Sequence, residues 1–102
     1  MKILTVCNHG NIRSVGLAYI LKTLFKHEAI AIGVEDTTIK TQQMLFDWAD
    51  KIIILTEDLK IDNPKAIYFD VGKDIWFDAK HQGLVHKLYK ELSKHPELFD
   101  NK

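Results

Sequence analysis

The stretch that decides the fold is Lys2-Ile-Leu-Thr-Val-Cys-Asn-His-Gly-Asn-Ile-Arg-Ser14. Its start, residues 2–6, is rich in β-favouring side chains and predicts a strand that stops at a polar segment containing glycine. Apolar side chains then return with helical spacing, which predicts a helix over residues 13–26 opened by Ser14. A strand, a polar loop and a helix in this order are typical of the start of an α/β fold.

The rest of the chain repeats this alternation of strand and helix. We expect strands over residues 29–32, 52–55 and 66–69, helices over 39–50 and 80–94, a polar and aromatic loop over 70–78, and a tail over 95–102. In the helix over 39–50, the side chains expected on the inward face are Met44, Leu45, Trp48 and Ala49. In the tail, Leu98 and Phe99 are expected to pack loosely or fray.

The expected strands are apolar runs without hairpin turns between them, which favours a parallel sheet with helices on both faces. We expect the strand over 52–55 to be buried on both faces. Right-handed crossovers place the loops that follow the strands at one carboxyl edge, where such sheets bind ligands. The sequence therefore predicts a three-layer α/β/α fold with its site at that edge.

The composition fits a single compact domain over residues 1–102. The chain has 102 residues, of which 46% are hydrophobic and 27% charged, so it carries enough apolar material for a core. Its 14 basic residues balance 14 acidic ones. A net charge of zero argues against a protein that coats nucleic acid or another polyanion.

The longest aliphatic run, residues 52–55, is far shorter than the roughly 18 residues that a membrane span requires. Strand-like sequence begins at Lys2, where a secretory leader would have a basic and then an apolar region. We therefore expect a cytoplasmic protein without a membrane span. Cys7 is the only cysteine, so it cannot form an internal disulfide or a cysteine-rich zinc site.

The candidate reactive residues lie in the loop after the first predicted strand. Cys7 and Arg13 are the only residues of their types, five residues separate them, and Ser14 follows at once. Random placement of the arginine would give this spacing in roughly 1% of cases, before the strand-loop-helix context is considered. Backbone N–H groups of such a loop, together with a helix N-terminus, converge on one point and form an anion cradle.

The loop residues have complementary properties. Arg13 adds a planar fork that binds two phosphoryl oxygens, and the same positive field favours a nucleophilic thiolate at Cys7. Ser14 can donate a hydrogen bond to that thiolate, and Gly10 permits a positive φ. We expect phosphate to be bound by Asn8, His9, Gly10, Asn11, Ile12, Arg13 and Ser14. The side chain of His9 either contacts the phosphate or points to solvent, and we favour the solvent position.

The alternative interpretation is structural. Cys7 would then be a small core residue at a strand end, and Arg13 a solvated charge at a helix start.

The segment Val6-Cys-Asn-His-Gly-Asn-Ile-Arg-Ser14 resembles the signature of the low-molecular-weight protein tyrosine phosphatases, Cys-x5-Arg-Ser/Thr after the first strand. The resemblance implies the fold of that family, with four parallel strands in the order 2-1-3-4. It also implies that Cys7 is a nucleophile forming a phosphocysteine, that Arg13 binds the phosphoryl group and that Ser14 assists the thiolate.

A general acid is needed for the leaving group. Asp74-Ile-Trp-Phe77 resembles the family's Asp-Pro-aromatic-aromatic element, so we predict Asp74 as the acid, with Asp70 and Asp78 as competitors. Trp76 and Phe77 either flank the ring of the substrate or pack against the last helix.

The chain also departs from the family pattern. Ile12 stands where the family commonly has a second cysteine, so oxidised Cys7 would lack an intramolecular disulfide partner.

Together these features predict a cysteine-dependent phosphomonoesterase, resembling a tyrosine phosphatase, that needs no cofactor or metal. Its partner would be a phosphorylated substrate such as a phosphotyrosine protein, and not nucleic acid or a membrane. Two alternatives are a binding module that recognises phosphorylated partners without turnover and an arsenate reductase that uses external thiols. Turnover that is abolished by Cys7→Ser separates the phosphatase from the binding module.

Overall fold

The computed structural model describes residues 1–8, 12–56, 59–71 and 82–98. Its elements are, in chain order, β1 (Lys2–Cys7), α1 (Arg13–Thr23), β2 (Glu28–Gly33), α2 (Ile39–Trp48), β3 (Lys51–Ile54), β4 (Ala66–Tyr68), α3 (Gln82–Leu92) and the 3-10 helix η1 (Pro96–Leu98). The predicted alternation of strands and helices is confirmed.

The four strands form one parallel sheet in the order β2-β1-β3-β4, which confirms the predicted fold class and strand order. β1 pairs with β2 as far as Cys7 opposite Gly33, and with β3 as far as Val6 opposite Ile54. The strand that carries Cys7 therefore lies inside the sheet, with a hydrogen-bonded neighbour on each side.

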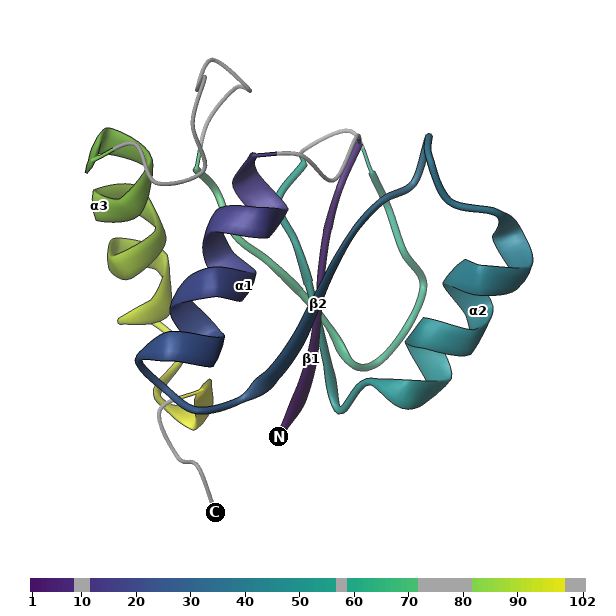
Figure 1. Ribbon diagram of the computed structural model, residues 1–102, viewed down its shortest axis with the longest axis horizontal. Coiled ribbons are helices and arrows are strands. Elements are labelled where there is room, and N and C mark those ends of the chain that lie inside the picture. The colour runs from purple at the N-terminus through teal and green to yellow at the C-terminus, as the bar shows by residue number, and fades with distance from the viewer. Residues whose placement is uncertain (9–11, 57–58, 72–81, 99–102) are drawn as a thin grey trace.

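Alternation of side chains along β1 divides the core into two layers. Ile3 and Cys7 face the layer covered by α1 and α3, whereas Leu4 and Val6 face the layer covered by α2 (Figure 1). The residues of β3 from Ile52 to Ile54 have no exposed surface, so the expected burial of this strand on both faces is confirmed.

α1 is shorter than predicted. It ends at Thr23, whereas the apolar pattern extends the prediction to residue 26. Lys26 has a φ of 59°, in the left-handed region that often follows a helix end, and His27 N donates to Leu21 O at 3.0 Å. Leu24 is consequently left 57% exposed.

The predicted inward face of α2 is wrong for Met44, which is 63% exposed. Leu45 and Trp48 do pack toward the core, and Ala49, which is buried, follows the helix as its C-cap. Helix geometry gives the reason, because at 100° per residue Met44 lies about 100° around the axis from Leu45, on the side away from the half-buried Gln42 and at the border of the inward face.

The end of the described chain is packed, and the prediction that Leu98 packs loosely or frays is wrong. Leu98 has no exposed surface, and its main-chain oxygen accepts a hydrogen bond from His27 Nε2 at 2.6 Å. His95 stacks on Phe69 with ring centroids 5.3 Å apart. Phe99 lies outside the described residues.

None of the described helices combines the length and apolar character needed to cross a bilayer.

Candidate active site

Cys7 and Ser14 form a buried pair where β1 gives way to α1. Cys7 is 2% exposed and ends the strand, and Ser14 has no exposed surface and lies in the first turn of the helix. Their Sγ and Oγ atoms are 3.1 Å apart, within hydrogen-bonding distance. An ionised sulfur has no proton, so in that state the serine hydroxyl is the donor.

Arg13 is buried beside this pair, at 5% exposure, although it stands at a helix start. Its Nη1 donates to the main-chain oxygen of Leu55 at 2.9 Å, and Leu55 N donates to Val6 O at 2.8 Å. The guanidinium is thus anchored where β3 and β1 end side by side. The interpretation of Arg13 as a solvated charge is wrong, and a buried guanidinium is stable only among acceptors or anions.

The main chain holds the start of the loop that follows β1. Cys7 O accepts from Val34 N at 3.0 Å, and Asn8 O accepts from Glu35 N at 2.9 Å, so the connection from β2 to α2 is bonded to the start of the loop. On the far side, Ile12 is the N-cap residue of α1 and supplies no side-chain cap. The positive end of the α1 dipole therefore adjoins the pair without the polar cap that Ser, Thr, Asp or Asn would provide.

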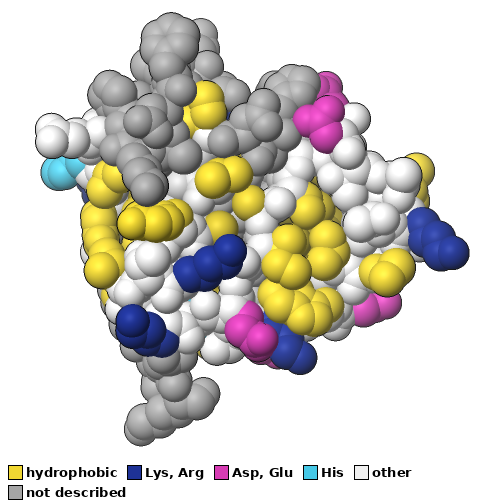
Figure 2. Space-filling model, in the orientation of Figure 1, with side chains coloured by type: hydrophobic (Ala, Val, Ile, Leu, Met, Phe, Trp, Pro, Cys, Tyr) yellow, Lys and Arg dark blue, Asp and Glu magenta, His cyan; other side chains and the backbone are white. Residues whose placement is uncertain are grey.

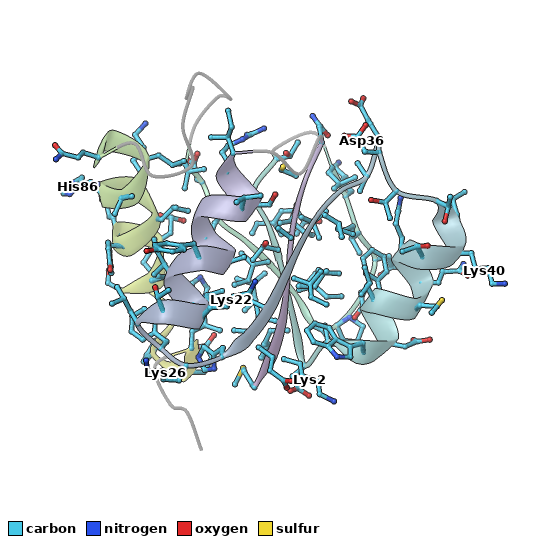
Figure 3. The ribbon with its side chains drawn as sticks, in the orientation of Figure 1. Lys2, Lys22, Lys26, Asp36, Lys40 and His86 are labelled. Atoms are coloured by element: carbon cyan, nitrogen blue, oxygen red, sulfur yellow. The ribbon has the colours of Figure 1, made fainter. Side chains whose placement is uncertain are left out.

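Acidic side chains lie at this end of the molecule. Glu35 and Asp36 are both exposed and follow Gly33, the partner of Cys7 in the sheet register. Asp36 is at the opposite end of the molecule from Lys2 and Lys26 (Figure 3). Acidic side chains form part of the upper right surface in the same orientation (Figure 2). Two exposed acidic side chains therefore follow the strand that pairs with the end of β1.

Asp70 lies against α3. Its N–H donates to Glu91 Oε1 at 3.0 Å. With Lys87, Lys90, Glu91 and Lys94 it lines a cleft of about 270 Å³, and Cys7, Arg13 and Ser14 are not among the described residues of that lining. The structure therefore associates this competitor for the acid role with a lysine-rich cleft on α3.

Glu91 is 6% exposed and holds this cleft together. Burial alone would raise the pKa of its carboxyl group, but hydrogen bonds from Lys94 Nζ at 2.6 Å and from the Asp70 amide favour the charged form. The charges of Lys94 and His95 act in the same direction, and the net result is a pKa below the ordinary glutamate value.

Other predicted site residues lie outside the described residues: His9, Gly10 and Asn11 of the loop, the acid Asp74, its competitor Asp78, and the aromatic residues Trp76 and Phe77. Ile12 is described, is half-buried and packs against the core layer of α1 and α3. In the described part of the chain, no three His, Cys, Asp or Glu side chains are placed to hold a metal ion.

One residue of this site was not singled out by the sequence. Thr5 has no exposed surface, and its Oγ1 donates to the main-chain oxygen of Ser14 at 2.7 Å. Ile30 O lies farther from the same atom, at 3.5 Å. The available signal was the spacing, because residues two apart in a strand share a face and Thr5 precedes Cys7 by two. A polar side chain on the core face of a central strand needs a buried partner.

Comparison of the chain with models of protein families, with curated proteins and with solved structures finds no match.

Proposed function

We propose that the protein is a cysteine-dependent phosphomonoesterase that resembles the low-molecular-weight tyrosine phosphatases in its mechanism. The observation that carries this proposal is the 3.1 Å contact between Cys7 Sγ and Ser14 Oγ. The residue directly before Ser14 is Arg13, whose side chain is buried. A hydroxyl donor at the sulfur, the adjoining N-terminus of α1 and a guanidinium carried by the first residue of that helix favour a thiolate and a bound oxyanion in this loop.

The reaction has two steps. The thiolate of Cys7 attacks phosphorus, so that an Sγ–P bond forms while the P–O bond to the leaving group breaks. The carboxyl group of Asp74, the acid that the sequence predicts, gives its proton to the leaving oxygen. Water then attacks phosphorus and gives a proton back to the same carboxylate, the Sγ–P bond breaks, and the thiolate and inorganic phosphate are released.

Arg13 and Ser14 have separate roles in these steps. Arg13 holds two phosphoryl oxygens and opposes the negative charge that the transition state spreads over them. Ser14 donates to the sulfur and improves it both as a nucleophile at neutral pH and as a leaving group in the second step. Aryl phosphates such as phosphotyrosine are the proposed substrates. The need for a reduced thiol suits the cytoplasm.

The test is steady-state hydrolysis of para-nitrophenyl phosphate with a reductant and a chelator present. We expect Cys7→Ser to reduce turnover to background, while Thr23→Val, a change in the exposed last turn of α1, leaves it unchanged. Among the carboxylates, Asp74→Asn should cause a larger fall than Asp70→Asn or Asp78→Asn.

Either of two results would assign a different function to the protein. Inorganic phosphate binding without hydrolysis by the wild-type protein would favour a phosphate-binding module. Reduction of arsenate with an added small thiol, again without hydrolysis, would favour an arsenate reductase.

A further inference from the structure

The first turn of α1 is held in an unusual way. Thr38, the N-cap of α2, accepts a hydrogen bond from Thr41 N at 3.2 Å, which is the normal side-chain cap. Ile12, the corresponding residue of α1, has no such bond. Two side-chain bonds tie the start of α1 to the sheet instead: Thr5 Oγ1 donates to Ser14 O at 2.7 Å, and Arg13 Nη1 donates to Leu55 O at 2.9 Å.

We propose that Thr5 is a positioning residue that sets the distance between the Ser14 hydroxyl and the Cys7 sulfur. The inference rests on the proposed function, since it assigns Thr5 to the activation of the same nucleophile. Thr5 and Cys7 belong to one rigid strand and face the same side of the sheet. Ser14 is bonded to both of them, through its main-chain oxygen to Thr5 and through its hydroxyl to Cys7.

These two bonds make a closed frame of strand and helix. With the main chain of Ser14 fixed to Thr5, its side chain needs only one rotamer to reach the sulfur, and this arrangement exists before substrate binds. All three residues are buried, so water does not replace either bond. Loss of the Thr5 hydroxyl leaves Ser14 in the helix but removes the bond that sets the distance between the Ser14 main chain and β1.

The experiment measures the rate of Cys7 alkylation by iodoacetamide as a function of pH, alongside turnover. Thr5→Val keeps the shape of the side chain and removes the donor. We expect the midpoint of its alkylation curve to rise by about 0.5 to 1 pH unit, the size that a weakened hydrogen bond to the thiolate gives. We also expect kcat to fall by about 3- to 10-fold, with KM within about 2-fold of wild type.

Three variants isolate the positioning role. Thr5→Ser keeps the hydroxyl and should restore the wild-type midpoint. Thr23→Val removes the same kind of bond at the other end of α1, where Thr23 Oγ1 donates to Tyr19 O at 2.7 Å, and should leave the midpoint unchanged. In a Ser14→Ala background, Thr5→Val should cause no additional shift, because Thr5 acts through Ser14.

An unchanged midpoint in Thr5→Val, or an equal and additive shift in the Ser14→Ala background, overturns the inference. If Thr5→Val does not fold, Thr5→Ala provides the same comparison with Thr5→Ser. The proposed function is tested separately by wild-type turnover. A protein that shows the midpoint shifts but no hydrolysis would retain the positioning role and lose the phosphatase assignment.

Discussion

Arg13 Nη1 and the main-chain oxygen of Leu55 are 2.9 Å apart, a bond that ties the start of α1 to the end of β3. Leu55 N in turn donates to Val6 O, one residue before the candidate nucleophile. The orientation of the guanidinium is therefore set by two strands of the sheet, and it does not depend on the exposed surface of the helix.

This bond makes Arg13→Lys an informative change. Lysine keeps the positive charge but lacks the planar fork, so it cannot hold two phosphoryl oxygens in parallel while also reaching Leu55 O. We expect KM for para-nitrophenyl phosphate and Kd for inorganic phosphate to rise by about 10- to 150-fold, the equivalent of one charged hydrogen bond. Lys22→Ala, in the exposed last turn of α1, is the control. Wild-type phosphate affinity in Arg13→Lys would contradict the assigned role.

The lowered pKa of Glu91 makes stability depend on pH. Its carboxylate is favoured in the folded protein, so its contribution to the free energy of unfolding is present above the ordinary glutamate pKa of about 4.3 and is lost as the pH falls through the lower folded pKa. Glu91→Gln should reduce the free energy of unfolding at pH 7 by about 1 to 3 kcal/mol and flatten its decline in acid. Urea unfolding between pH 3 and pH 7 measures both effects.

The control for that series is Glu97→Gln. The side chain of Glu97 is 44% exposed, and its Oε1 lies 3.3 Å from His95 Nδ1. Its free energy of unfolding should stay within about 0.5 kcal/mol of wild type. Parallel pH profiles for wild type and Glu91→Gln would show that Glu91 does not carry the effect.

Leu98→Ala tests whether the end of the described chain belongs to the core. The side chain of Leu98 is fully buried, so we expect its truncation to lower the free energy of unfolding by about 2 to 5 kcal/mol. Leu24→Ala removes the same atoms from a position that is 57% exposed, and it should change stability by no more than about 0.5 kcal/mol. Equal losses in the two variants, measured by urea unfolding, would argue against this packing.

The two exposed acidic side chains, Glu35 and Asp36, should affect the choice of substrate. We expect the double variant Glu35→Gln, Asp36→Asn to raise kcat/KM for phosphotyrosine peptides with acidic neighbours by about 2- to 5-fold at low salt, as expected for exposed charges. The gain should shrink as ionic strength increases. Asp47→Asn, on exposed α2, should leave the same ratio unchanged. A gain that is independent of salt would point to a cause other than charge.

The sequence predicted the sheet well because its apolar runs carry the signal directly. The strand around Ile53 reads as buried on both faces, and in the structure it is. The expected hydrogen bond between Cys7 and Ser14 also came from local sequence, and the structure places their side chains in contact. Local pattern suffices in these cases because each residue lies next to the strand or helix end that positions it.

The features that were missed depend on contacts between distant parts of the chain. A lysine gives no stop signal of the kind that glycine gives, so the left-handed turn at Lys26 was not predicted. The bonds from Thr5 to Ser14 and from Arg13 to Leu55 join different elements, and no spacing along the sequence shows them. The burial of Leu98 likewise depends on His27, which is 71 residues away.

The position of β1 inside the sheet also has a consequence for fluctuations of the folded protein. Opening of the edge strand β4 breaks its pairing with β3 alone and leaves β1 bonded to both of its neighbours. Amide hydrogens of β1 should therefore stay protected when β4 opens, whereas those of β4 exchange through such smaller openings. Since Cys7 ends this interior strand and is buried, its sulfur should stay shielded from oxidants while β4 opens.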